Sequence, residues 1–363
     1  MTKISAKIVA DSISRKGHRI TTMELVFPRF ILAELNTHRL FSKNSASSRA
    51  IPFEKMLKSV KEDPFIPIAW QKDHKGMQGT EYFTDKKDIS WLTMNHLKAR
   101  DQAVERAIDA NEKGLTKQIC NRYLEPFMWH KVLLTATEFE NFFNLRCPQY
   151  EYFLIDRIYK AKSRKDLIRQ FSDSAIVSKQ FESYSELGWL SINKGQAEVH
   201  MMRLAECMYD AMVESSPKIL EPGEWHIPYF NIDAMEEAEI VLLGFASGDY
   251  FSKTNIKLNL QTAQLMVSSA RCARLSYETL GDDAKIDFTK DLSLHDNLLK
   301  SKHMSPFEHC AKAMDDKEYE TNVKGLLFDH SSTMEGYQPE GNSLGWCKNF
   351  RGFIQYREQL ENK

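Results

Sequence analysis

The stretch NTHRLFSKNSASSRA, residues 36–50, concentrates hydrogen-bonding side chains directly behind the apolar run FPRFILAEL, residues 27–35. Pro28 stands where a helix would begin, and the Ala, Leu and Glu that follow favour continuing it, so a short helix is predicted here. The serine-rich run 42–48 predicts a loop, because short hydroxyl and amide side chains compete for backbone groups. We therefore expect a helix end that passes into a loop.

This loop has the chemistry of an anion site. It offers two arginines, Arg39 and Arg49, together with four serines. A guanidinium matches phosphate oxygens with a rigid fork, and loop N–H groups add neutral donors. The alternative is a solvated loop whose arginines pair with carboxylates elsewhere in the chain.

The whole composition limits the class of protein. The 363 residues include 49 Lys and Arg against 50 Asp and Glu, so there is no overall basic surface for nucleic acid. The six cysteines form no CxxC pair, which argues against zinc and disulfide frameworks and favours reduced thiols. The sequence has no apolar run long enough to predict a signal peptide or a membrane span. We expect a soluble, cytoplasmic protein that does not bind membranes.

The patterns along the chain predict an α+β fold, an antiparallel sheet packed with many helices. Residues 5–11 and 18–27 predict a hairpin, and residues 131–146 predict a strand that leads into a helix. Residues 63–90 and 220–230 are predicted to be irregular connections, and residues 303–309 a turn. The predicted helical segments are 53–62, 91–122, 151–187, 196–214, 257–280, 289–301 and 347–361. In the last of them, Arg351 and Gln355 would lie one helical turn apart.

The first motif (residues 36–50) contains T-H-R-x-x-S-x-N-S-x-S-x-R. It resembles the signature of the flavin-dependent thymidylate synthases, R-H-R-x-x-S-x-N-E-x-S-x-R, at all fixed positions except Thr37 and Ser45. The resemblance implies that three residues contact the flavin and three hold the nucleotide and its phosphate. The flavin residues are His38, Arg39 and Asn44, and the nucleotide residues are Arg39, Ser47 and Arg49.

The second motif, KHMSPFEH at residues 302–309, resembles the family's G-H-x-S-P-F-E-H turn with only the glycine changed. SARCARLSY, residues 269–277, resembles the A-A-R-V-S-Y segment that precedes it. The resemblance implies flavin contacts from Ser276, His303, Ser305 and Glu308. Alternatively, the turn is an ordinary helix start, with Ser305 as N-cap and Glu308 completing a capping box. This interpretation is compatible with flavin binding, because a helix N-terminus also suits an anionic cofactor.

The third motif combines NRYLEP (121–126) with TATEFENFFNLR (135–146). It resembles the family's A-R-x-x-L-P and T-x-N-x-R-x-L-x-N-F-L-x-L-R segments, although Thr135 and Thr137 replace an asparagine and an arginine. The resemblance implies that Arg122 and Arg146 belong to the nucleotide site and Asn141 to the flavin site. Arg146 could instead be a surface arginine that complements a helix dipole.

The motif order differs from that of the common family members, because the SPFEH turn comes last here. The chain therefore resembles a circularly permuted relative, which a fold tolerates when its termini lie close together. We expect a single domain over residues 1–363, with a possible helical insertion at about 155–260.

The resemblance implies an enzyme, a flavoprotein methyltransferase of nucleotide biosynthesis. It would bind FAD, use NADPH and methylenetetrahydrofolate as co-substrates, and methylate C5 of dUMP to give dTMP. Arg146 is the candidate catalytic residue, because its permanent charge can stabilise negative charge on the pyrimidine ring. Family members are homotetramers, so a homo-oligomer is expected.

Alternatives remain open at the level of sequence. The same machinery could act on dCMP or leave a hydroxymethyl group for modified-base synthesis, or the chain could be a non-catalytic nucleotide-binding homologue. No metal is expected, since His226 and His303 lack a partner at ligand spacing. No GxGxxG or P-loop motif occurs, and Cys147 is interpreted as a structural thiol.

Overall fold

The computed structural model describes residues 2–76, 79–230, 260–275, 288–323 and 343–361. Its centre is a five-stranded sheet with the strand order β3-β4-β2-β1-β7. The strands are β1 (Ser5–Ser14), β2 (Arg19–Pro28), β3 (Ser42–Ser45), β4 (Trp129–Ala136) and β7 (Lys218–Leu220). Neighbours are antiparallel except β1 and β7, which are parallel. The α+β prediction is confirmed.

The β1–β2 hairpin turns at Gly17, whose φ of 82° is a conformation that glycine adopts without steric cost. The predicted helix after Pro28 is present as a short η1 (Arg29–Ile31) followed by α1 (Leu32–Asn36). The expectation of a loop over 42–48 is wrong for its first half, because Ser42–Ser45 forms the edge strand β3. Its backbone pairs with β4 from Ser42↔Thr135 to Ser45↔Val132, so tertiary pairing overrides the weak strand propensity of serine and asparagine.

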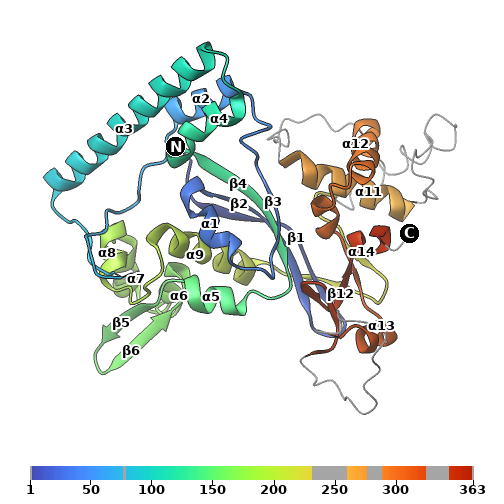
Figure 1. Ribbon diagram of the computed structural model, residues 1–363. Coiled ribbons are helices and arrows are strands. Elements are labelled where there is room, and N and C mark those ends of the chain that lie inside the picture. The colour runs from blue at the N-terminus through green and yellow to red at the C-terminus, as the bar shows by residue number, and fades with distance from the viewer. Residues whose placement is uncertain (1, 77–78, 231–259, 276–287, 324–342, 362–363) are drawn as a thin grey trace.

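One face of this sheet is apolar. Helices α1, α5 (Glu140–Arg146) and α9 (Val199–Glu214) cover it (Figure 1). Alternate residues of β2 and β4 point toward these helices, as the two-residue period of a strand requires. They are Met23, Leu25, Phe27, Val132, Leu134 and Ala136.

The opposite face is covered by the C-terminal part of the chain. Helices α11 (Leu260–Arg274), α12 (Phe288–Lys300) and α14 (Tyr356–Glu361) lie on this side (Figure 1). The short η5 (Ser305–Glu308) and a three-stranded sheet, β12-β9-β8, complete it. Those strands are β8 (Trp225–His226), β9 (Ala311–Ala313) and β12 (Phe353–Gln355).

Two further groups of elements flank the sheet in Figure 1. The first contains α2 (Phe53–Glu62), the long α3 (Lys86–Glu112), α4 (Lys117–Tyr123) and η2 (Glu125–Phe127). The second contains the hairpin β5 (Tyr150–Leu154) and β6 (Arg157–Ala161), with α6 (Arg164–Arg169), α7 (Ala175–Glu182) and α8 (Glu186–Ser191). The remaining described elements are α13 (Asp316–Thr321), β10 (Trp346–Cys347) and β11 (Phe350–Arg351).

Two helix predictions are corrected. Residues 151–187 begin with the β5–β6 hairpin, because Tyr152 and Tyr159 pair across the strands and both pack their rings against Phe171. Residues 347–361 form β10 to β12 before the last six become α14. Gly352, at φ 76°, lies between β11 and β12, where a Cβ would come within 2.7 Å of His18. Arg351 and Gln355 are therefore on strands and not on one helix face.

Within the described ranges, no helix combines the length and the apolar composition that crossing a bilayer requires.

Candidate functional site

The three motifs come together around the edge strand β3. The strand belongs to the first motif, pairs with β4, which carries Thr135 of the third motif, and packs against η5 of the second. The loop after β3 is held by α4, whose Asn121 Nδ2 donates to Ser48 O at 2.8 Å and to Ile51 O at 3.1 Å. Segments from the two ends of the chain thus lie side by side in one subunit.

On the apolar face, the structure brings His38 and Arg146 together. Arg146 Nε donates to His38 Nε2 at 3.3 Å, and Arg146 Nη1 lies 3.6 Å from the Glu34 carboxylate. The His38 ring stands edge-on to Phe142, with centroids 4.8 Å apart. Burial, followed by the charges of Arg146 and Lys43, lowers the pKa of His38 to about 4. His38 is therefore neutral at physiological pH.

Lys43 supports this pair, although the sequence reasoning did not select it. Its Nζ donates to Leu35 O at 3.2 Å and to His38 O at 3.1 Å, which ties the end of α1 to β3. Burial lowers the pKa of Lys43 to about 8. Because Lys43 occupies a variable position of the signature, no sequence signal marked it.

On the opposite face, Asn44 is buried and its Nδ2 donates to Cys272 O on α11 at 3.3 Å. The second motif begins where α12 ends. Lys302 N donates to Leu299 O at 3.1 Å and His303 N to Leu298 O at 2.9 Å, the two bonds of a Schellman C-cap. This cap requires a left-handed residue, and Lys302 adopts φ 57°. The family signature has glycine at this position, so the lysine here keeps the backbone shape that the glycine would favour.

The remaining residues of the second motif are more open. His303 and Ser305 are exposed, and His303 Nδ1 lies 3.1 Å from Ser301 Oγ. The capping-box alternative is wrong, because the N-cap of η5 is Met304 and no side chain caps it. Glu308 instead accepts from Arg357 Nη1 at 2.6 Å. Ser276 lies outside the described residues.

Four of the predicted residues lie on the surface. The side chains of Arg39, Arg49, Arg122 and Asn141 are exposed, and within the described ranges none makes a hydrogen bond or ion pair. Among the described residues, the arginines of this loop therefore do not pair with carboxylates, contrary to what the alternative interpretation predicted. Ser47 is half-buried, and its Oγ accepts from Arg49 N at 3.3 Å, which orders the turn.

The C-terminal strands also reach the first motif. Gln355 Nε2 donates to Asn349 Oδ1 at 2.7 Å, and Asn349 Nδ2 donates to Ser42 Oγ at 3.0 Å and to Leu40 O at 3.1 Å. The sequence predicted Gln355 on a helix, which is wrong because it ends β12, and it gave no indication of Asn349. The partners lie at opposite ends of the chain, so no local pattern could reveal the contact.

The predicted site is divided by the sheet. His38 and Arg146 lie with α1 and α5 on the apolar face, while Asn44 and η5 lie on the other. The two groups can meet only around the free edge of β3 and not in one enclosed pocket. Cys147, next to Arg146, is buried, and burial raises the pKa of its thiol, as expected for a structural cysteine.

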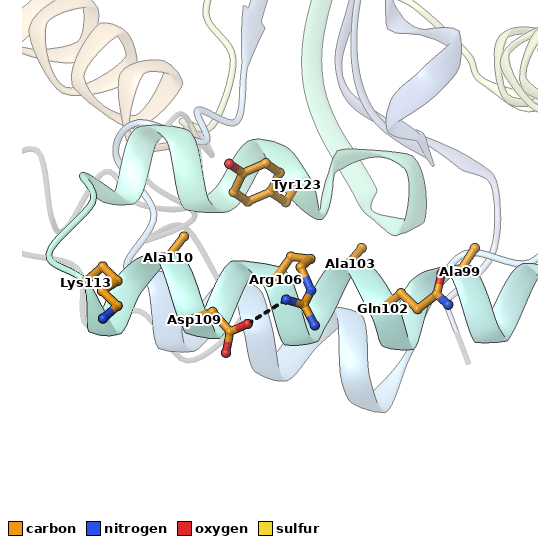
Figure 2. A pocket seen from close by; sticks show the side chains of 8 residues that line it. All are labelled: Ala99, Gln102, Ala103, Arg106, Asp109, Ala110, Lys113 and Tyr123. Atoms are coloured by element: carbon orange, nitrogen blue, oxygen red, sulfur yellow. Dashed lines mark ion pairs between the residues drawn. The ribbon is translucent and has the colours of Figure 1, made fainter.

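The cavities found lie elsewhere. A shallow one of about 610 Å³ follows α3 and α4, where alanines leave room beside the Arg106–Asp109 ion pair (Figure 2). Another, of about 390 Å³, is lined by residues of β1, α11 and the 224–230 region, including Ser12. Neither cavity is lined by a predicted site residue. The candidate site is therefore defined by the side chains of the three motifs and not by a cavity.

No protein-family model matches the chain, and no curated protein matches it. The solved structures with weak similarity include two of the UMP/dUMP methylase PolB from Streptomyces cacaoi. The form bound with 5-Br UMP has a TM-score of 0.38 and 15% identity, over 59% of this chain and 90% of that one. The form bound with 5-Br dUMP has a TM-score of 0.35 and 13% identity, over 59% and 91%.

Proposed function

We propose that this protein binds a pyrimidine deoxynucleoside monophosphate and transfers a one-carbon unit to C5 of its base, converting dUMP to dTMP. Methylenetetrahydrofolate would be the donor, and NADPH would reduce a bound FAD. The observation that carries the proposal is the convergence of three motifs around β3 within one subunit. An accidental likeness in three separate segments would not require them to be neighbours.

The nucleotide phosphate would be held by the exposed arginines. Arg39, Arg49 and Arg122 have no carboxylate partner within the described ranges, so their charge is available to an anion. The loop of Arg49 is fixed by Ser47 and by Asn121 of α4, the helix that also carries Arg122. A phosphate on this ordered surface would gain charge-assisted hydrogen bonds without displacing existing ion pairs.

The donors and acceptors on the opposite face fit a flavin in chemical type. Two buried polar atoms there, His309 Nε2 and Gln355 Oε1, have no hydrogen-bond partner among the described residues. Buried unpaired groups are costly, and an aromatic ring system with N–H and C=O edges would satisfy them. Asn44, His303 and Ser305 lie on this side and would hold the cofactor. His38, Arg39 and Asn141 lie on the side of α1 and α5 and would reach it only around the edge of β3. When bound, FAD would supply the hydride.

Arg146 would stabilise charge on the substrate ring. Its Nε donates to neutral His38 and its Nη1 lies beside Glu34, which fixes the plane of the guanidinium. A fixed positive charge beside the pyrimidine favours negative charge at C5, which makes that carbon nucleophilic without a protein nucleophile.

We propose a homo-oligomer, a homotetramer by resemblance to the family. Site residues occupy both faces of the sheet at the open edge of β3, so a single subunit leaves the ligands exposed to water. A second copy over this edge would exclude that water and strengthen the electrostatic contacts.

The test is a product assay on the purified protein. Incubation with dUMP or dCMP, methylenetetrahydrofolate and NADPH should give a nucleotide heavier by one methylene, and the protein should be yellow and release FAD. A product carrying a hydroxymethyl group, or a product from dCMP alone, would replace dTMP synthesis by modified-base synthesis. Colourless protein that binds dUMP without turnover would reduce the proposal to nucleotide binding.

A further inference from the structure

The β5–β6 hairpin has one packed face and one bare face. Its register pairs Tyr152 with Tyr159 and, one step nearer the turn, Phe153 with Ile158. Because successive side chains of a strand point to opposite faces, the two pairs lie on opposite faces of the hairpin. Tyr152 and Tyr159 pack their rings against Phe171 and belong to the core of this part of the chain. We call the face of Phe153 and Ile158 the outer face.

The outer face exposes large apolar side chains. Phe153 is 67% exposed and Ile158 is 53% exposed, although they are direct partners across the strands. Ile155, in the turn that joins the strands, is 80% exposed. Single apolar side chains are ordinary on a protein surface, but three adjoining ones form a patch of the kind that marks a protein contact. The hairpin extends away from the central sheet, at the lower left of Figure 1.

The turn of the hairpin is strained at the same place. Between the strand ends Leu154 and Arg157 it contains only Ile155 and Asp156. Ile155 adopts φ 57°, a left-handed conformation in which such turns favour glycine or asparagine and a β-branched residue is an outlier. An exposed isoleucine gains no burial within the subunit to offset this strain. Burial against a partner would supply the compensation.

The charges of the outer face make it complementary to itself. Glu151 and Lys160 are the next pair on this face, with Oε1 and Nζ 2.6 Å apart. When two outer faces meet about a two-fold axis that runs along the strands, β5 of one copy lies over β6 of the other. Phe153 then meets Ile158 of the second copy, and Glu151 meets its Lys160. Apolar groups face apolar groups and each charge faces its opposite.

We propose that the outer face of the β5–β6 hairpin binds the same face of a second copy of this chain. The inference rests on the homo-oligomer of the proposed function and adds a second interface to it. A contact that relates two copies by a two-fold axis joins only those two, so a contact over the edge of β3 does not by itself build a tetramer. The hairpin contains no residue of the three motifs, so this interface holds subunits together without taking part in the site.

The charge pairing can be tested by mixing two variants. Glu151→Lys and Lys160→Glu should each raise the dissociation constant of this contact by about tenfold, because two copies of either variant bring like charges together twice. A one-to-one mixture should associate as tightly as the unchanged protein, since opposite charges then meet across the axis. Sedimentation velocity at low salt measures all three. An ion pair confined to one subunit predicts no such rescue, and a mixture no tighter than its components would overturn the proposal.

The apolar contact is tested by a single substitution. Phe153→Asp should raise the dissociation constant by about 30-fold or more, as for a central interface residue, and leave the fold intact because the side chain is exposed. Ile176→Asp is the matched control: Ile176 is 83% exposed on α7, which packs through Phe181 on the other face of the hairpin. Light scattering should show a smaller assembly for Phe153→Asp alone. Equal masses for the two variants would overturn the contact.

Ile155→Gly separates strain from association. In the dissociated Phe153→Asp background it should raise the urea midpoint, because glycine relieves the left-handed strain. In the otherwise unchanged protein it should weaken association, and undiminished association would remove Ile155 from the contact. Unchanged protein that stays a monomer at every concentration would overturn the interface, whether or not it binds dUMP. If the mixing experiment succeeds and dUMP is not bound, the proposed function fails and the hairpin interface stands.

Discussion

The two faces of the central sheet differ in what they contain. One face carries Met23, Leu25 and Leu134, which pack against α1, α5 and α9. The other carries Thr22, Thr135, Ser42 and Asn44, which bond to histidine, asparagine and backbone groups of the C-terminal half. Strand alternation separates the two sets even though they are neighbours in sequence.

The difference has an energetic meaning. A fully buried leucine or methionine contributes about 1.5–3 kcal/mol to folding, whereas a buried neutral hydrogen bond contributes about 0.5–1.5 kcal/mol net. The apolar face therefore contributes most of the stability of the sheet. The polar face contributes less to stability, and its side chains are positioned for binding. His38 and Arg146 lie at the rim of the stable face, where α5 fixes them.

The largest effect is expected from the apolar face. Leu134→Ala should lower the free energy of unfolding by about 2–5 kcal/mol, because it leaves a cavity in the main core. Thr135→Ser, on the adjacent residue and the opposite face, keeps the hydroxyl and should cost about 1 kcal/mol. Urea denaturation of both variants measures the difference. A larger cost for Thr135→Ser would reverse the assignment of the two faces.

The exposed arginines should affect binding and not stability. Arg49→Ala should weaken the binding of a pyrimidine nucleoside monophosphate by about 1.5–3 kcal/mol, through loss of a charged hydrogen bond to phosphate. Calorimetric titration measures this. Arg106→Ala is the control: Arg106 is also exposed, but its guanidinium is ion-paired with Asp109 on α3. Equal affinities for the Arg49 and Arg106 variants would remove Arg49 from the phosphate site.

The pH dependence of stability reports on the buried histidines. The folded-state pKa of His226 is about 3, below the value of about 6.5 in the unfolded chain, so the unfolded state binds more protons between these values. Stability is therefore full above about pH 6.5 and falls as the pH drops through this window. His226→Gln should reduce the slope by up to about 1.4 kcal/mol per pH unit. Denaturation curves at several pH values with an unchanged slope would show that His226 is not buried neutral.

The smallest effect is expected at the start of the second motif. Lys302→Gly should raise the free energy of unfolding by roughly 0.5 kcal/mol, because relief of the left-handed strain exceeds the entropy lost by glycine. Lys300→Gly, two residues earlier in the last turn of α12, should instead lower it by about 1 kcal/mol. Loss of stability in Lys302→Gly would mean that the lysine side chain has a role of its own.

Much of the fold could be predicted from local pattern. The β1–β2 hairpin, α9 and α12 follow from turn residues and apolar periodicity, and β4 with α5 from a strand-to-helix change in spacing. β3 could not, because its serines and asparagine are extended only through pairing with β4. The β10–β12 segment looked helical because its strands are very short and its sheet partner, β9, is distant in sequence.

The candidate site was foreseen as a set of residues but not as an arrangement. Likeness to a family signature selected His38 and Arg146, which do lie in contact. The signature could not indicate that Asn44 and η5 lie on the opposite face of the sheet from His38 and Arg146. The face to which each side chain of β3 points depends on its register with β4. His309 and Thr135 belong to the motifs, but the buried hydrogen bonds that join them continue to Thr22 and His226, which no motif contains.

The central claim is that the surface assembled around β3 binds a pyrimidine nucleotide through its phosphate. Calorimetric titration of the purified protein with dUMP, dCMP and their unphosphorylated nucleosides tests it most directly. We predict that at least one monophosphate binds and that its nucleoside binds far more weakly. A nucleoside that binds as tightly as its monophosphate, or no binding of either, would contradict the claim.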